Sequence, residues 1–152
     1  AVKKVPALAE EIVANAVSQV RKRFPGNVIT ISVEDDPRDV PMDGTLIVQV
    51  IINLIENAIF HSGSVDAIHV SASIGETMAR FSVRDHGCGV DVQRMERLMA
   101  GYIDSERTGD STRGMGIGLS LCSAIIKAHG GRIWAENGED GGAVFSFELP
   151  LE

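Results

Sequence analysis

Three glycines at a spacing of two residues, followed directly by an apolar helix pattern, constrain the fold of this chain most strongly. The run comprises Arg113, Gly114, Met115, Gly116, Ile117 and Gly118. The residues after it have the spacing of an amphipathic helix that begins at Leu119 and ends at Gly130. A glycine loop before a helix exposes backbone N–H groups at the positive end of the helix dipole, where a phosphate binds well. Glycines also serve in plain turns, so the run alone leaves both interpretations open.

Length and composition are those of one ordinary domain. The chain has 152 residues, enough for a single domain with its own core. Hydrophobic residues make up 44% and charged residues 23%, as in common globular proteins. No apolar run reaches the length of a membrane span, and the first residues do not resemble a signal peptide. Residues 151–152 follow the last expected strand and are interpreted as a possible cloning remnant on a fragment of a longer protein.

The net charge of −7 excludes nucleic-acid binding as the expected function, because such a surface must be basic. It also means that local features must hold any anionic ligand, since the field of the whole protein opposes it. Cys88 and Cys122 are too few for a disulfide framework, and neither lies in a zinc-binding pattern. We therefore expect reduced thiols and a cytoplasmic location.

The first half of the chain reads as helix, strand and helix. Apolar residues at helical spacing predict a helix from Val5 to about Phe24, and residues 28–33 read as a strand. A second helix is predicted from Leu46 to about His61, with Asp43 as its N-cap.

The second helix carries a narrow polar stripe on an otherwise apolar surface. The residues on this face are Gln49, Asn53, Glu56, Asn57 and Phe60. A solvated edge usually carries Lys and Glu, whereas Asn is a poor residue for a helix interior. The two asparagines beside a glutamate therefore favour a ligand or metal shell, because buried polar groups need partners.

The second half contains a hairpin, a helix, a loop, the glycine run with its helix, and a closing hairpin. Segments 69–74 and 78–85 alternate as strands, and Asp85 is followed by the flexible Gly87 and Gly89, which allow a ligand to approach the backbone. An Asp-Gly turn is the plainer interpretation of that stretch. Residues 91–102 have helical spacing, and the polar segment 103–113 has the length of a functional loop such as a lid. Segments 132–136 and 143–149 form the last hairpin.

Taken in order, these stretches resemble the ATP-binding catalytic domain of sensor histidine kinases, within the gyrase, Hsp90, histidine kinase and MutL ATPase fold. Residues 53–58 resemble the N box, residues 85–89 the G1 box and residues 114–119 the G2 box. Residues 126–137 and 141–145 are similar to the tail of potassium-sensing Kdp-type kinases. The resemblance covers nearly the whole chain.

The resemblance implies a role for each matching position. Asn57 would coordinate Mg²⁺ at the phosphates with Asn53 nearby, and Glu56 would orient or activate the reacting groups. Asp85 would accept the adenine amino hydrogen, with Gly87 and Gly89 shaping the pocket. The glycine run, from Arg113 to the helix start at Leu119, would hold the phosphates. The cofactors implied are ATP and Mg²⁺.

The chain departs from the family pattern in three respects. Phe60 and His61 stand where a basic residue and an aromatic residue are common, so a phosphate contact from position 60 is missing. Arg113 and Lys127 are candidate substitutes, and His61 either faces phosphate or is a plain helix-end residue. The F box is poorly formed, with Met95, Leu98, Met99 and Tyr102 in place of phenylalanines. The acceptor motif is absent around all four histidines, which are His61, His69, His86 and His129.

We therefore expect an α+β fold: a two-layer α/β sandwich of the Bergerat type, with a mixed, mostly antiparallel sheet and about three helices on one face. The expected function is transfer of the γ-phosphoryl group of ATP to a histidine on a separate dimerisation domain, with a response regulator downstream. An anti-sigma-factor-type serine kinase and a nucleotide-binding regulatory module without turnover are the alternatives. No nucleic acid and no membrane insertion of this domain are expected, and the isolated domain is expected to be a monomer.

Overall fold

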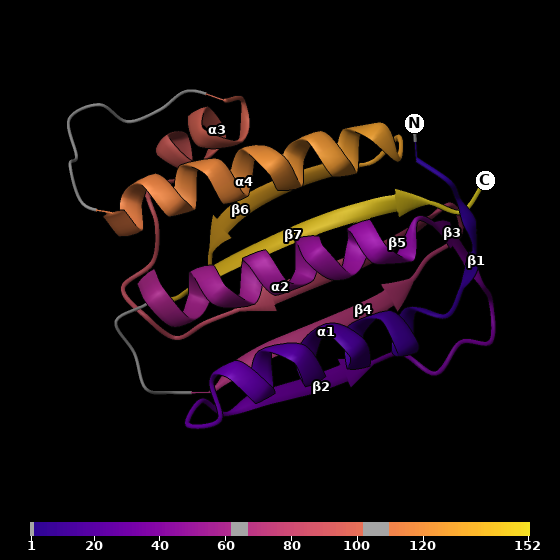
Figure 1. Cartoon of the computed structure of the whole chain (residues 1–152), viewed down its shortest axis with the longest axis horizontal. Coiled ribbons are helices and arrows are strands. Elements are labelled where there is room, and N and C mark those ends of the chain that lie inside the picture. Colours follow the sequence, from indigo (N-terminus) through magenta and orange to yellow (C-terminus); the bar gives the residue numbers. More distant parts are fainter. Residues whose placement is uncertain (1, 62–66, 102–109) are drawn as a thin grey trace.

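A five-stranded sheet carries a layer of helices on one of its faces (Figure 1). The computed structural model describes residues 2–61, 67–101 and 110–152, with side chains described except at 61 and 110–117. The strands lie in the order β2-β4-β5-β7-β6. β2 pairs with β4 in parallel, whereas the other three pairings are antiparallel. The expected α+β sandwich with a mixed, mostly antiparallel sheet is thereby confirmed.

The strand bounds follow the alternating sequence pattern closely. They are Ile29–Val33 for β2, Ile68–Ile74 for β4, Met78–Arg84 for β5, Arg132–Asn137 for β6 and Ala143–Pro150 for β7. Along β4 and β5 every second side chain is buried against the helices, and the residues between them lie on the open face of the sheet. Phe81 of β5 and Phe147 of β7 stack in the core, with ring centroids 4.9 Å apart.

Within the described residues the chain has four helices. They are α1 (Ala9–Arg23), α2 (Gly44–His61), α3 (Val92–Met99) and α4 (Asp110–Ala128). α1 packs over β2 and β4, α2 over β4 and β5, and α4 over β6 and β7. α3 packs against α4 and β6. The Asp91 side chain caps α3 by accepting a hydrogen bond from the Arg94 N–H at 3.2 Å, and Gly101 ends this segment with φ +96°.

The prediction that the first helix starts at Val5 is wrong. Val5–Ala7 form strand β1, which pairs antiparallel with β3 (Val40–Met42), and α1 starts at Ala9. Pro6 lies opposite Pro41 in this ladder. Neither proline has an N–H to donate, so this short two-stranded pair cannot be extended as a regular sheet. The partner strand is some 35 residues away, and local helical spacing does not reveal it.

The prediction of a glycine loop before a helix that begins at Leu119 is also wrong. α4 already starts at Asp110, so Gly114, Gly116 and Gly118 belong to its first turns. No proline interrupts the segment, and each glycine costs a helix only about 1 kcal/mol relative to alanine. The lid was expected over residues 103–113, but residues 110–113 belong to α4. Residues 102–109, which include Tyr102, lie outside the described part.

Among the described residues, none of the helices combines the length and the apolar character needed to cross a bilayer. Figure 1 shows that the C-terminal end of α2, the end of β5 and the start of α4 lie at one end of the molecule. The chain termini lie at the other end. The three sequence boxes therefore lie at the same end of the molecule, although they are separated along the chain.

Candidate functional site

Asn53 lies on the side of α2 that faces α4. Its Oδ1 accepts a hydrogen bond from Gln49 Nε2 at 3.3 Å, and its Nδ2 contacts the Cys122 sulfur at 3.7 Å. The Cys122 sulfur also lies 3.9 Å from the Val50 carbonyl oxygen. Burial raises the pKa of the Cys122 thiol to about 11, so Cys122 is a neutral partner that holds Asn53 in place.

Asn57 is buried, with 9% of its surface exposed. Its Nδ2 has no hydrogen-bond partner within the described residues. A buried amide without a partner costs about 1–3 kcal/mol, so such groups are retained where they serve another purpose. An Asn side chain has both an amide oxygen that accepts and an amide N–H group that donates, so it can turn either one towards a polar ligand. An amide oxygen is the kind of hard ligand that Mg²⁺ accepts, so Asn57 fits the metal role implied by the resemblance.

Asp85 follows directly after β5, and 6% of its surface is exposed. Its Oδ1 accepts hydrogen bonds from the Gly87 N–H at 2.9 Å and from the Ala143 N–H at 3.2 Å. Its own N–H donates to the Ala143 carbonyl at 3.0 Å. These bonds fix the orientation of the carboxylate. Oδ2 makes no hydrogen bond to the described residues, so it remains available as an acceptor.

Two glycines let the G1 segment and the β6–β7 turn approach each other closely. A Cβ atom at Gly142 would lie 2.0 Å from the Asp85 carbonyl oxygen. Gly89 has φ +82°, and a Cβ there would lie 2.6 Å from Asn137 Oδ1. Asn137 in turn accepts from the Val90 N–H at 2.8 Å and donates to the Val90 carbonyl at 3.0 Å. The last hairpin therefore packs directly against the Asp85 segment.

Glu56 and Phe60 face the end of the first helix. Glu56 Oε1 forms an ion pair with Arg23 Nη1 at 2.8 Å. Phe60 is 58% exposed, and its ring meets the Phe24 ring edge-on at 5.4 Å between centroids. In this structure the Glu56 carboxylate is therefore held by Arg23, and Phe60 packs against α1 instead of offering a charge.

The start of α4 supplies the remaining predicted residues. Leu119 is fully buried and acts as a core residue, and a Cβ at Gly118 would meet nothing within 4 Å. The other residues of the glycine run have a helical backbone, but their side chains lie outside the described part. The residues concerned are Arg113, Gly114, Met115, Gly116 and Ile117. The His61 side chain lies outside the described part as well.

The sequence motifs did not identify several residues that shape the site. These are Val90, Cys122, Asn137, Gly142 and Ala143. Only the Gly141-Gly142 pair left a signal in the sequence, since paired glycines mark close backbone approach. His129, by contrast, has a structural role: it is buried, its Nδ1 donates to the Ile125 carbonyl at 2.8 Å, and its Nε2 accepts from the Asp43 N–H at 3.0 Å.

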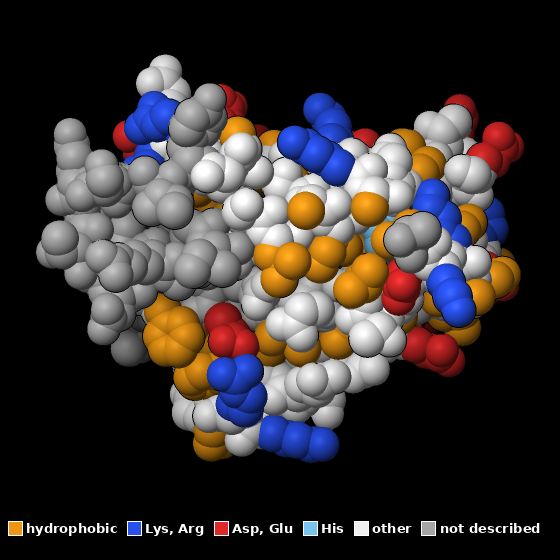
Figure 2. All heavy atoms as spheres, turned by 45° about the horizontal axis from the view of Figure 1, so that its top comes forward, with side chains coloured by type: hydrophobic (Ala, Val, Ile, Leu, Met, Phe, Trp, Pro, Cys, Tyr) orange, Lys and Arg blue, Asp and Glu red, His pale blue; other side chains and the backbone are white. Residues whose placement is uncertain are grey.

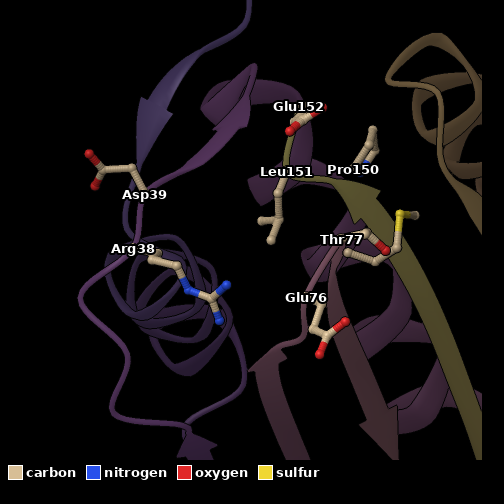
Figure 3. Close-up of a pocket in the computed structure, with 8 residues that line it drawn as sticks. Arg38, Asp39, Glu76, Thr77, Pro150, Leu151 and Glu152 are labelled. Atoms are coloured by element: carbon tan, nitrogen blue, oxygen red, sulfur yellow. The ribbon is translucent and has the colours of Figure 1, made fainter.

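A separate pocket of about 600 Å³ lies at the opposite end of β5, where Thr77 and Met78 begin the strand (Figure 3). Arg38 reaches across it from the segment before β3. The Arg38 guanidinium is already bonded to the Asp36 carboxylate at 2.8 Å. Three further carboxylates line the pocket, from Asp39, Glu76 and Glu152. This charge disfavours a nucleotide, so we assign the candidate site to the Asp85 end.

The space-filling view looks obliquely onto the helical face (Figure 2). Apolar side chains gather in the middle of this face, whereas Lys, Arg, Asp and Glu lie mostly around its rim. Leu121 of α4 contributes one of the exposed apolar side chains, at 48% exposure.

Comparison with known proteins gives independent support for a nucleotide-binding fold. Residues 42–152 match the family described as histidine kinase-, DNA gyrase B-, and HSP90-like ATPase. The sensor protein KdpD of Clostridium acetobutylicum is 38% identical over 152 residues, covering 99% of this chain and 17% of KdpD. The adaptive-response sensory kinase SasA of Rippkaea orientalis is 35% identical over 151 residues, covering 97% of this chain and 37% of SasA.

Solved structures agree with this assignment. The catalytic domain of the histidine kinase ThkA superposes with a TM-score of 0.82 at 29% identity, covering 98% of each chain. ThkA in complex with the response regulator protein TrrA superposes with a TM-score of 0.80 at 26% identity, covering 99% of this chain and 42% of ThkA. The chain spans well under half the length of these curated relatives. By its family match and by its likeness to KdpD, the chain belongs to the histidine kinase-, DNA gyrase B- and HSP90-like ATPase family, as a catalytic domain of the histidine kinase type.

Proposed function

We propose that this domain binds ATP together with Mg²⁺ and transfers the γ-phosphoryl group to a histidine on a dimerisation domain. The observation that carries the proposal is the Asp85 carboxylate. Its Oδ1 is held by the N–H groups of Gly87 and Ala143, and its Oδ2 is left free of the described residues. An adenine amino group needs such a fixed acceptor, and a buried acceptor gives more selectivity than an exposed one.

The metal and phosphates are assigned to the neighbouring elements. Asn57 would hold Mg²⁺ through its amide oxygen, with Asn53 beside it and Glu56, Phe60 and His61 on the same helix end. When bound, Mg²⁺ supplies positive charge that offsets the charge of the phosphates. The work left to the chain is positioning, and Cys122 supports it by holding the Asn53 amide.

The first turns of α4 would bind the phosphates through backbone N–H groups at the positive end of the helix dipole. The first N–H groups of any helix have no partner within it, so they are available to an anion. The free groups are those of residues 110–113, and Gly114, Gly116 and Gly118 come after them in α4. The three glycines weaken the helix, so its first turns can unwind at small cost and turn further N–H groups towards the ligand. Gly87 and Gly89 would line the base, and Arg113 would replace the missing basic residue. Lys127 is ruled out as a substitute, because it lies in the last turn of α4, far from the start of this helix.

The acceptor and the downstream partner lie outside this chain. The names of the relatives support a two-component pathway, since KdpD is a sensor protein and ThkA has been solved with a response regulator. We propose a histidine-bearing dimerisation domain of the same protein as acceptor and a response regulator as the next recipient. We also place this domain in the cytoplasm, as part of a protein with a membrane anchor, by analogy with sensor kinases.

A transfer assay tests the proposal directly. The domain is incubated with γ-labelled ATP, Mg²⁺ and a separately produced dimerisation domain that carries the acceptor histidine. We expect label on the acceptor, sensitive to acid and stable to alkali, as for phosphohistidine. Acid-stable label on a serine would support the serine-kinase alternative instead.

One observation favours the non-catalytic alternative. The Glu56 carboxylate, which would orient the reacting groups, is bonded to Arg23, and Phe60 offers no charge to phosphate. A module that binds ATP without turnover would show tight nucleotide binding and no label on the cognate acceptor. An Arg23→Ala variant separates the two functions, because release of Glu56 should raise the transfer rate only in a catalytic domain.

A further inference from the structure

Two histidines outside the nucleotide site bring their ring nitrogens together on the open face of the sheet. His69 belongs to β4, where the adjacent Ile68 and Val70 are buried on the helical side. His86 follows Asp85 after β5. The two Nε2 atoms lie 3.1 Å apart, and the rings are perpendicular with centroids 5.2 Å apart.

The outer nitrogen of each ring is held by an oxygen. His86 Nδ1 bonds to Asp140 Oδ2 at 2.5 Å, and His69 Nδ1 bonds to Thr30 Oγ1. A carboxylate only accepts, so His86 carries its hydrogen on Nδ1 and keeps a lone pair on Nε2. Asp140 is held in turn by Arg84 Nη2, which bonds to its Oδ1 at 3.1 Å. The ring of His86 is therefore fixed in one tautomer and one orientation.

Thr30 allows His69 to adopt the same tautomer, with its hydrogen on Nδ1. The Thr30 hydroxyl lies 3.5 Å from the Ile68 carbonyl oxygen, so it can donate there while it accepts from a hydrogen on His69 Nδ1. In this structure the Nε2–Nε2 contact is a hydrogen bond, so one of the two Nε2 atoms carries a hydrogen. With hydrogen on Nδ1 of both rings, as Asp140 and Thr30 allow, both Nε2 lone pairs become available to a metal ion. Metal-binding histidines usually have this outer arrangement, with the second ring nitrogen donating to a carboxylate or another oxygen.

We propose that His69 and His86 form a binding site for a divalent transition-metal ion of the zinc class. Two nitrogens bound to one ion at about 2.0–2.1 Å, with angles between 90° and tetrahedral, lie about 2.8–3.4 Å apart. The observed separation of 3.1 Å falls within this range. His69 is exposed and the His86 side chain is 28% exposed, so water can fill the other coordination positions.

The character of the ligands distinguishes this site from the Mg²⁺ position assigned to Asn57. Imidazole nitrogen suits Zn²⁺, Cu²⁺ and Ni²⁺, whereas Mg²⁺ prefers oxygen. Among the described residues no group of three or more His, Cys, Asp or Glu side chains is arranged so that it could hold a metal ion. The site therefore has two protein ligands and binds with moderate affinity. Arg84 lies opposite His69 in the β4–β5 ladder, but its charge is offset by Asp140.

Calorimetric titration of the tag-free, nucleotide-free domain with zinc chloride tests the site. We expect one ion per chain, no competition from excess Mg²⁺, and loss of binding in both His69→Ala and His86→Ala. Asp140→Asn should weaken binding roughly 10- to 100-fold, as loss of an outer-shell partner does. Cys88→Ser is the matched control, because Cys88 is the exposed one of the two cysteines and its thiol could bind zinc by itself. It should bind zinc as the unmodified domain does.

A second measurement keeps the test independent of folding defects. Zinc should shift the ring ¹⁵N resonances of His69 and His86 at Nε2 and leave those of the buried His129 in place. His69→Gln replaces the alanine variant if the latter is unfolded by circular dichroism. Zinc binding that persists in either histidine variant, or that disappears in Cys88→Ser, would overturn the proposal.

Discussion

Asp85 Oδ1 accepts a hydrogen bond from the Ala143 N–H at 3.2 Å, across 58 residues of sequence. The same two residues are joined a second time, by the Asp85 N–H and the Ala143 carbonyl at 3.0 Å. This double link ties the G1 segment to the start of β7. The orientation of the carboxylate assigned to adenine therefore depends on the last hairpin as well as on its own loop.

Replacing Asp85 with Asn should reduce ATP affinity and remove the preference for adenine. The new amide keeps one oxygen for the N–H groups of Gly87 and Ala143, but it presents a donor where the adenine amino group also donates. A hydrogen bond to a charged group contributes about 1.5–3 kcal/mol, so we expect affinity to fall roughly 10- to 100-fold. Calorimetry with ATP and GTP measures both effects. Asp39→Asn, an exposed position at the other end of β5, is the control, and unchanged ATP binding in Asp85→Asn would remove Asp85 from the site.

Adding a methyl group at Gly142 should destabilise the domain. The Cβ would lie 2.0 Å from the Asp85 carbonyl oxygen and 2.9 Å from the His86 Cα, and backbone atoms cannot move aside cheaply. Overpacking of this kind costs about 1–3 kcal/mol, which corresponds to a Tm lower by roughly 2–12 °C. Thermal unfolding by circular dichroism measures it. Gly26→Ala, where a Cβ meets nothing within 4 Å, should leave the Tm nearly unchanged. Equal Tm values for the two variants would contradict the close approach.

The local parts of the site could be predicted from the sequence, because they depend on periodicity and on residue type. Asn53, Glu56 and Asn57 share one side of a helix, and that follows from their spacing alone. Asp85 at a strand end follows from alternation and two glycines. In each case the neighbours along the chain set the geometry.

The remaining features depend on partners far away in the chain. The link from Asp85 to Ala143 and the contact of Asn53 with Cys122 across 69 residues are set by how strands and helices pack. The pairing of β1 with β3 likewise overrides a helical spacing that begins at Val5. At the glycine run the error had another origin: glycine is permissive, so its sequence pattern fits a loop and a weak helix equally.

A Gly118→Ala substitution tests whether the glycine run changes conformation when nucleotide binds. In the helix a Cβ at Gly118 meets nothing within 4 Å, so alanine should stabilise α4 by about 1 kcal/mol and raise the Tm by roughly 2–4 °C. If the phosphates need a less regular backbone there, ATP affinity should fall at the same time. Thermal unfolding and calorimetry are measured on one preparation. A higher Tm with unchanged ATP affinity would show that the run binds nucleotide as a helix or not at all.

Asn57→Ala should alter the dependence of ATP binding on Mg²⁺ without lowering the stability of the nucleotide-free domain. The substitution removes the buried Nδ2, which has no partner among the described residues, and so relieves an unpaired donor. It also removes the oxygen assigned to Mg²⁺. Calorimetric titrations of ATP at increasing Mg²⁺ concentration give the metal dependence, with the exposed Asn15→Ala as control. A normal Mg²⁺ response in Asn57→Ala would exclude Asn57 as a ligand, and a large loss of stability would assign it a structural role instead.

The Asp36–Arg38 pair should make part of the stability dependent on pH below about 4. The Arg38 side chain donates to both Asp36 oxygens, and this holds the pKa of Asp36 at about 2. Because the pKa is lower in the folded chain than the ordinary value near 4, the pair stabilises the fold above that value. Its contribution is lost as the pH falls towards 2 and the folded carboxylate takes up a proton.

Comparison of the unmodified domain with Asp36→Asn isolates this effect from the titration of other groups. The Arg38 side chain also donates to the Ile74 carbonyl at 3.1 Å, so the variant still has one anchor for the guanidinium beside the pocket of Figure 3. Urea unfolding between pH 3 and neutral pH gives the difference in free energy of unfolding. We expect Asp36→Asn to be less stable near neutral pH, and the difference to shrink steadily as the pH falls below about 4. A difference that stays constant over this range would mean that the ion pair does not lower the pKa of Asp36 in solution.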